Sequence, residues 1–356
     1  MKAKILFEAR NVPAYQNKMF ETRKAALECP TGNVVLAQDP SSGLVVNIEY
    51  DPHLLRYDET YQNEQGVSTQ FRGHLEQVLD KLMMVFRDDD ILEIGCGKGM
   101  FVELMRARGI KARGIDNAYE GNSPYIEKRH FGTVAETPTK AIVLRHVLEH
   151  IPNPLNFLRL VAEANGGHGF IYIEVPCFDW IMRSKAWFDI FYEHVNYFRL
   201  SDFRKAFDDI IDSGYLFGGQ YLYVIASLSS LRKFLKEENQ VHLTLPLDFN
   251  RALDQLAIRA LAAPMCKRII WGAAAKGVMF AYHLGLRGVR FEAAVDINPG
   301  KQGRFLALTA LEVVAPEVAL GSLPPGSEIY VMNSNYLAEI SSLGGNHFRY
   351  ISVDKL

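Results

Sequence analysis

The feature that most constrains the fold is an apolar run that ends in glycines and leads into a helical pattern. Residues 88–99 read DDDILEIGCGKG, so the apolar run is followed at once by Gly95, Gly97 and Gly99. Glycines at a strand end allow the backbone to approach a ligand closely, because they carry no Cβ atom. The segment MFVELMRARG then has helical spacing. This strand–turn–helix unit begins an alternation that favours an α/β fold.

The alternation continues twice along the chain. Buried strand patterns at 111–116, 140–147 and 169–176, with a helix over 154–165, are typical of a doubly wound, mostly parallel sheet. A second alternation starts at IIWGAAAKG and indicates another, smaller nucleotide-fold unit. We therefore predict a Rossmann-like α/β protein with a small mixed N-terminal region and a second α/β domain. The predicted domains are 1–70, 71–235 and 236–356.

Composition limits the partners. The chain has 356 residues, 48% of them hydrophobic and 22% charged, with a net charge of −2, which gives no general attraction to nucleic acid or to anionic membrane. We see no apolar run that could span a bilayer and no signal peptide, so the cytoplasm is the expected location. The four cysteines are scattered without a CxxC pair, which disfavours a disulfide framework or a thiolate zinc site.

The glycine loop and its flanking acids indicate the ligand. Asp116 follows Gly95 by about 20 residues, the spacing of an acid that accepts hydrogen bonds from ribose hydroxyls. Met100 replaces the third glycine of a dinucleotide pattern, and Glu93 would repel a pyrophosphate. An acid here suits a cationic ligand, such as the sulfonium and amino-acid end of S-adenosylmethionine. The alternative is a bare strand–helix turn.

Residues 91–109, the GID of 114–116 and the HVLEHIPNP of 146–154 together resemble the class I S-adenosylmethionine-dependent methyltransferases. The resemblance implies that the first motif cradles the methionine end and that Asp116 binds the ribose. It also implies that 145–151 borders the cofactor and the active site, although these polar residues could equally belong to a helix start. The implied cofactor residues are Glu93, Gly95, Cys96, Gly97, Gly99, Asp116 and His146.

The aromatic stretch FDIFYEHVNYF at 188–198 resembles a segment of the sugar-nucleotide C-methyltransferases, which methylate a keto-sugar on a nucleoside diphosphate. There it contributes catalytic residues. Carbon methylation requires removal of a proton next to a ketone, and an imidazole is a suitable base. We expect His194 to be that base, Glu193 to assist and Tyr197 to bind substrate. Adjacent side chains rarely point the same way, so Glu193 could instead contact substrate or backbone; a satisfied polar pair at a core edge is the alternative.

The C-terminal unit supplies a further candidate. Backbone amides of 272–275 with Lys276 could hold a phosphate, or they could form a turn of small residues beside a solvated lysine. GAAAKG and DINPGKQGRF resemble the C-terminal domain of the same C-methyltransferases. We therefore assign Lys276 to substrate binding.

The chain departs from that family in three places. The family opens with a zinc domain of two CxxC pairs, whereas Asp39 and Ser42 stand where the second pair would be, so we expect no structural zinc and no metal. The tyrosine-rich segment is only partly echoed, with Tyr61 as a candidate catalytic residue and Tyr57 as a candidate substrate contact. Gly219 and its neighbouring glycine match the family pattern, but the arginine that follows them in the family is absent here. The identity of the substrate therefore stays open.

These observations favour an S-adenosylmethionine-dependent methyltransferase that methylates carbon in a nucleotide-linked keto-sugar through an enolate. Two alternatives stay open. One is an O- or N-methyltransferase of a small natural product or a polysaccharide precursor, and the other is a non-catalytic, methyltransferase-like scaffold. The expected partners are a small-molecule substrate and, at most, a second copy of the chain.

Overall fold

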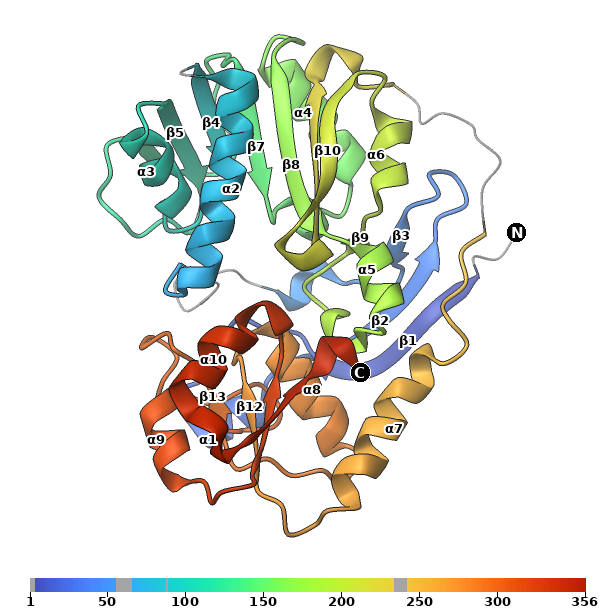
Figure 1. The fold of residues 1–356 in the computed structure, drawn as a ribbon. Helices are drawn as coiled ribbons and strands as arrows, with labels where there is room; N and C mark the ends of the chain where they lie inside the picture. Colours follow the sequence, from blue (N-terminus) through green and yellow to red (C-terminus); the bar gives the residue numbers. More distant parts are fainter. Residues whose placement is uncertain (1–3, 56–65, 88, 234–241) are drawn as a thin grey trace.

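The structure is a computed structural model that describes residues 4–55, 66–87, 89–233 and 242–356. Its described strands form three sheets of four, seven and five strands. Figure 1 shows the seven-stranded sheet above the five-stranded one, with the N-terminal strands running beside both. The predicted α/β class is confirmed.

The seven-stranded sheet has the order β10-β11-β8-β7-β4-β5-β6. Five strands are parallel, while β11 runs antiparallel to both β8 and β10 at one edge. The strands are β4 (Asp90–Ile94), β5 (Lys111–Asp116), β6 (Ile126–Lys128), β7 (Ala141–Arg145), β8 (Phe170–Pro176), β10 (Ile210–Leu216) and β11 (Tyr221–Ser227). The central strands are mostly apolar because helices cover both faces, with Glu93 and Glu174 as buried exceptions.

Two helical layers bury this sheet. The helices α2 (Thr69–Phe86) and α3 (Met100–Ala107) share one core with its first face, and α4 (Pro154–Ala164) and α6 (Leu200–Ala206) pack on the other. Ser68 caps α2 by accepting a hydrogen bond from the Phe71 amide, and Pro154 occupies the first turn of α4, where no amide donor is needed. The carboxyl ends of the parallel strands all face the C-terminal unit (Figure 1).

The N-terminal sheet is completed by a distant segment. It contains β1 (Ile5–Pro13), β2 (Thr31–Gln38), β3 (Val45–Asn47) and β9 (Asn196–Tyr197), with α1 (Arg23–Leu27) between the first two. Val45 pairs with Tyr197 and Val46 with Asn196, so the aromatic stretch belongs partly to this sheet. A linear division of the chain at residue 70 could not anticipate that exchange.

The C-terminal unit is a parallel sheet in the order β14-β13-β12-β15-β16. Its strands are β12 (Arg268–Trp271), β13 (Ala294–Val295), β14 (Val313–Val314), β15 (Glu328–Val331) and β16 (Arg349–Ser352). Its helices are α7 (Phe249–Leu261), α8 (Ala275–Gly285), α9 (Pro316–Ser322) and α10 (Leu337–Gly344). The helix α5 (Phe178–Arg183) does not belong to this unit; it lies in the segment between β8 and α6, residues 177–199, which we call the crossing segment. Reciprocal amide–carbonyl bonds between Phe20 and Phe305, 3.1 and 2.8 Å long, fasten the N-terminal region to this unit.

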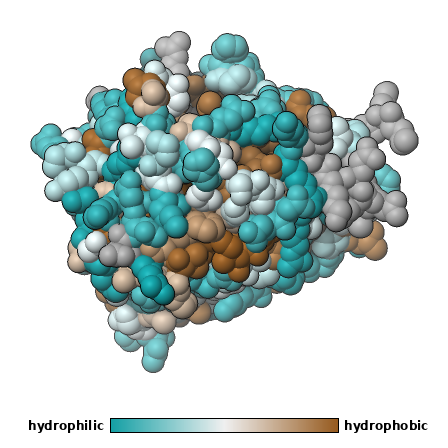
Figure 2. Space-filling model, turned by 90° about the horizontal axis from the view of Figure 1, so that it is seen from above, coloured by the Kyte–Doolittle hydropathy of each residue, from teal (hydrophilic) through white to brown (hydrophobic). Residues whose placement is uncertain are grey.

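The surface shown in Figure 2 is mostly hydrophilic, with hydrophobic atoms gathered in a small area. Among the described residues, no helix is long and apolar enough to cross a membrane.

Candidate active site

A cavity of about 350 Å³ opens where the three units meet. The glycine loop after β4 and the segment after β7 form one wall, the crossing segment forms another, and the C-terminal unit closes the third side. The predicted residues on its lining are Glu93, Gly95, Cys96, Gly97, His146, His194 and Lys276.

The glycine loop has the conformation that its sequence predicts. Gly95 and Gly97 adopt positive φ angles of 74° and 56°, in the region that favours glycine. The Gly97 amide donates a 2.8 Å hydrogen bond to Asp116 Oδ2, and the Ala118 amide donates to Oδ1. A Cβ atom on Gly97 would meet no atom of the described chain within 4 Å, so that side of the loop is open. Asp116 and Gly99 support the loop from behind and do not line the cavity.

Glu93 lies buried at the cavity wall with its carboxylate only partly compensated. Arg145 approaches Oε1 at 3.8 Å, whereas Oε2 has no hydrogen-bond partner among the described residues. Burial raises the pKa of Glu93 to about 7, and the charges of Asp116 and Glu174 add to the increase against the opposing effect of Arg145. A buried oxygen without a partner is costly unless a ligand compensates it.

Beside it lies a buried ionic cluster that the sequence did not single out. Glu174 accepts a hydrogen bond from the Tyr172 hydroxyl at 2.8 Å, and it lies 3.1 Å from His74 Nε2 and 3.4 Å from Arg145. Burial opposes ionisation of Glu174, but Arg145 and the two neighbouring imidazoles outweigh it and hold its pKa well below the usual range. The alternating pattern of FIYIEVP, with one acid inside a buried strand, was the available signal.

His146 is held by the same cluster. Its Nδ1 lies 3.4 Å from Glu149 Oε1, and its Nε2 lies 3.2 Å from Glu174 Oε1. Burial lowers the pKa of His146, but the two carboxylates more than offset this and raise it to about 9. The ring also packs edge-on against Tyr221 at 4.5 Å between centroids. His146 is thus a positively charged part of the wall at neutral pH.

His194 faces the cavity as predicted. It is 6% exposed, its ring lies 3.9 Å from the Phe191 ring and 5.0 Å from the His150 ring, and Nδ1 has no partner among the described residues. Burial holds the pKa of His194 well below its usual range, and electrostatic interactions with His150, His146 and Lys276 lower it further. The imidazole is therefore neutral and keeps a lone pair at neutral pH.

Glu193 points the other way, which corrects the expectation that it assists His194 directly. Its Oε1 accepts hydrogen bonds from the amides of Gln16 and Asn17 at 2.6 and 3.2 Å, and Oε2 accepts one from the Asn17 side chain. It is fully buried and does not line the cavity. Glu193 lies in a turn, from which its side chain fastens the N-terminal region while His194 lines the cavity.

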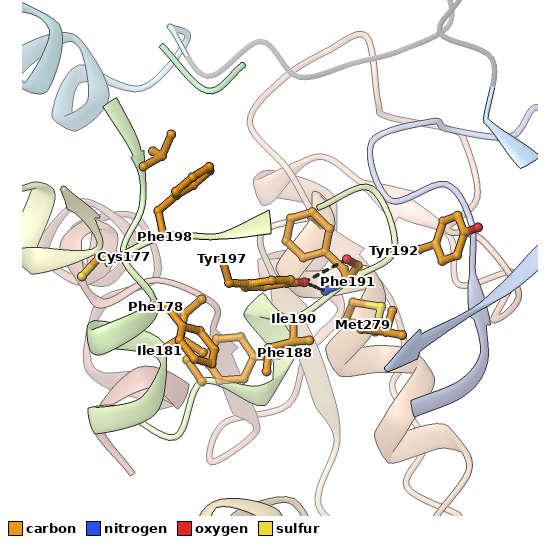
Figure 3. Close-up of a cluster of buried hydrophobic side chains, with 14 of the residues drawn as sticks. Cys177, Phe178, Ile181, Phe188, Ile190, Phe191, Tyr192, Tyr197, Phe198 and Met279 are labelled. Atoms are coloured by element: carbon orange, nitrogen blue, oxygen red, sulfur yellow. Dashed lines mark hydrogen bonds between the residues drawn. The ribbon is translucent and has the colours of Figure 1, made fainter. Parts of the chain in front are cut away.

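Two expected substrate contacts also lie away from the cavity. The Tyr197 hydroxyl accepts a hydrogen bond from the Phe191 amide at 3.0 Å and donates one to the Phe191 carbonyl at 3.1 Å (Figure 3). It closes the turn that presents His194, surrounded by the buried Phe178, Ile190 and Phe198. Gly219, with a φ of 85°, stands in a turn beside Trp180. Both predicted contacts are thus structural in position.

Lys276 lies on the cavity wall at the start of α8, but it is engaged. Its Nζ donates a 2.8 Å hydrogen bond to Gln220 and forms a 3.1 Å ion pair with Asp189. The neighbouring Asp296 accepts a bond from the Ala273 amide, and Lys301 contacts it at 3.0 Å. This loop repeats the Gly97–Asp116 arrangement of the first unit. The candidates Tyr57 and Tyr61 lie outside the described residues.

The wall around the glycine loop fits S-adenosylmethionine. The Glu93 oxygen that lacks a hydrogen-bond partner among the residues described suits the cationic amino-acid end, and the open side of Gly97 leaves room that a side chain would fill. Asp116 accepts hydrogen bonds from two backbone amides behind this loop.

Comparisons with known proteins agree with this reading. Residues 68–210 match the methyltransferase domain family, and residues 249–342 match the C-methyltransferase C-terminal domain. The chain is 24% identical over 291 residues to the C-methyltransferase NovU of Streptomyces niveus, covering 71% of this chain and 68% of NovU.

Solved structures resemble part of the chain. One is an S-adenosylmethionine-dependent methyltransferase from Archaeoglobus fulgidus, with 21% identity and a TM-score of 0.32 over 44% of this chain and 96% of that chain. Another is the plantazolicin methyltransferase BpumL in complex with SAH, with 14% identity and a TM-score of 0.37 over 48% and 87%. From its two matched domains, the chain is an S-adenosylmethionine-dependent methyltransferase that carries the C-terminal domain of the C-methyltransferases.

Proposed function

We propose that this methyltransferase acts on the carbon next to a ketone in a nucleotide-linked keto-sugar, through an enolate, with His194 as the general base. The observation that carries the proposal is the buried Nδ1 of His194, which has no hydrogen-bond partner in the described part of the chain and lies on the wall of the cavity. The C-terminal domain match and the name of the NovU relative support carbon as the acceptor.

The residues divide the work as follows. His194 takes the proton from the acceptor carbon, and the electron pair of the broken C–H bond stays on the substrate as an enolate. Phe191 packs on the imidazole and restricts water at the base. Bound S-adenosylmethionine supplies an electrophilic methyl group. Glu93 and the Gly97 loop hold that cofactor, and Tyr197 keeps the turn of His194 in place.

The nucleotide end of the acceptor would lie on the C-terminal unit. Lys276 and the amides at the start of α8 face the cavity there, and Lys276 would exchange its contact with Gln220 for a phosphate oxygen. Asp296, oriented by the Ala273 amide, offers a second anchor for hydroxyl groups of the nucleotide.

The test follows deuterium uptake at the sugar carbon in deuterated buffer, with a panel of 4-keto nucleotide sugars. We expect exchange by the wild type and a loss of at least about 100-fold in His194→Ala, the low end of the effect of a general base. His53→Ala, which changes an exposed imidazole, is the matched control. Cofactor affinity measured by calorimetry should be equal in all three proteins.

Three outcomes would contradict the proposal. Unchanged exchange in His194→Ala would remove the base, and methyl transfer to hydroxyl or amine acceptors without exchange would favour the O- or N-methyltransferase alternative. A chain that binds cofactor but methylates no acceptor of either kind would return the scaffold alternative.

A further inference from the structure

We infer that Glu149, His150 and His194 form a binding site for a divalent transition-metal ion such as zinc on the wall of the cavity. The carboxylate and the two imidazoles each offer one ligand atom, and these atoms lie within 4.8 Å of one another. All three residues line the cavity. Two imidazoles and one carboxylate make up the protein ligands of three-ligand zinc sites that keep a fourth position open.

The backbone holds the three residues together across 43 positions of sequence. The Val195 amide donates a 2.9 Å hydrogen bond to the Glu149 carbonyl, and the Asn196 side chain donates to the Ile151 carbonyl at 2.7 Å. His150 and Glu193 are 43 residues apart in the chain, yet His150 Nδ1 lies 2.8 Å from the carbonyl oxygen of Glu193. The ligands are therefore brought together by the fold itself.

The hydrogen bonds also orient the donor atoms. Because His150 Nδ1 faces a carbonyl oxygen, it must carry the proton, which leaves the lone pair on Nε2. Metal-binding histidines commonly have this arrangement, in which the second ring nitrogen donates to a carbonyl or carboxylate. His146 orients the Glu149 carboxylate in the same way, at 3.4 Å from Oε1.

Two of the three residues carry a buried side-chain atom without a hydrogen-bond partner among the described residues. These are Nδ1 of His194, a residue that is 6% exposed, and Oε2 of Glu149, which is 1% exposed. Zinc–nitrogen bonds of about 2.0–2.1 Å place tetrahedral ligands roughly 3.3 Å apart. Small side-chain rotations would therefore close the cluster on an ion, which would satisfy both buried atoms.

The consequence for catalysis rests on the proposed function. A bound ion uses the lone pair that His194 needs to accept a proton, and its open position faces the acceptor space. Zinc therefore inhibits methyl transfer reversibly and in competition with the keto-acceptor, and a chelator restores activity. The cofactor loop is not part of the metal site, so cofactor affinity does not change.

The test titrates the chelator-treated full chain with Co²⁺, followed by its visible absorption, and with Zn²⁺ by calorimetry. We expect one ion per chain, with affinity at least tenfold lower in Glu149→Gln, His150→Ala and His194→Ala. His53→Ala and Cys266→Ser, which change other accessible donors, should bind like the wild type. Glu149→Gln conserves shape, and the melting temperature of each variant is compared with that of the wild type.

Equal metal affinity in the wild type and all three ligand variants would overturn the site. Variant-sensitive binding without zinc inhibition of an active enzyme would overturn the inhibitory role. If no keto-sugar is methylated but metal binding still depends on the three residues, the proposed function fails and the metal site stands.

Discussion

Glu93 is a buried carboxylate whose second oxygen has no partner among the described residues, so its charge state should govern cofactor affinity. Its pKa of about 7 means that it is increasingly ionised as the pH rises through neutrality. We therefore expect the affinity for the cationic cofactor to rise between pH 6 and 8, about tenfold or less. Glu93→Gln should bind more weakly at pH 8 and lose this pH dependence, whereas Glu103→Gln on the exposed face of α3 should keep it. Calorimetry at several pH values measures this affinity, and a wild-type affinity that does not change with pH would contradict the prediction.

Two glycines of the loop should fail differently when replaced by alanine. A Cβ on Gly95 would lie 2.4 Å from Val147 Cγ2, whereas one on Gly97 would enter open space. Gly95→Ala should therefore lower the free energy of unfolding by about 2 kcal/mol or more, from both the clash and the positive φ. Gly97→Ala should lower the free energy of unfolding by only about 1 kcal/mol, because the positive φ is its one unfavourable feature. The variant should nevertheless bind cofactor far less tightly. Denaturant melts and cofactor titrations distinguish the two, and equal behaviour would contradict the assignment.

At the scale of elements, the turn between β2 and β3 is held by the carboxylate of Asp39. Asp39 Oδ1 accepts hydrogen bonds from the amides and hydroxyls of Ser41 and Ser42, at 2.6 to 3.0 Å. Burial raises the pKa of Asp39, but these hydrogen bonds outweigh it and lower the pKa, so their stabilisation is lost as the pH falls through the folded pKa. Asp39→Ala should cost about 1–2 kcal/mol of unfolding free energy. Asp39→Asn, measured by the same chemical denaturation, should cost less; an equal loss would show that the turn does not depend on the acceptor.

The packing of α8 against the Trp187 turn introduces acid sensitivity. His283 is buried beside Trp187, and burial, with a smaller effect of Arg287, lowers its pKa to about 4. The unfolded chain, with an ordinary pKa near 6.5, binds a proton that the folded chain does not, so stability falls as the pH drops from 6.5 to 4. The full loss is about 3 kcal/mol. His283→Leu should lose less stability than the wild type over this range in thermal melts, and parallel curves would contradict the prediction.

For the whole molecule, Gln220 is one of the buried side chains that join the two α/β units. Its side-chain oxygen accepts hydrogen bonds from Lys276 at 2.8 Å and from Asn333 at 2.9 Å, and its nitrogen donates to Asn333. Gln220→Ala should leave these buried groups short of partners, at about 1–3 kcal/mol each. We expect calorimetry to show a separate, earlier transition of the C-terminal unit. Gln77→Ala, on the exposed face of α2, is the control. A single unshifted transition in Gln220→Ala would contradict the role of Gln220 in joining the two units.

Local pattern accounts for the parts that could be predicted. The runs at Ile91–Ile94 and Ala141–Arg145 are strands because all but one residue in each is apolar, and the glycine loop follows from the positive φ angles that Gly95 and Gly97 supply. The pairing of Val45 with Tyr197 could not be predicted, since a two-residue strand carries no periodicity of its own. The directions of Glu193 and His194 depended on that pairing.

The sequence by itself determined the α/β class and the glycine loop, because each depends on neighbouring residues or a short spacing. Only the tertiary structure decided that Glu193 faces the N-terminal region, that Tyr197 supports a turn and that Lys276 is paired with Asp189. The same folding brings one donor atom each of His194, Glu149 and His150 to within 4.8 Å of one another. Contacts between segments far apart in the chain have no local signature, because they are selected by the packing of the three units around one cavity.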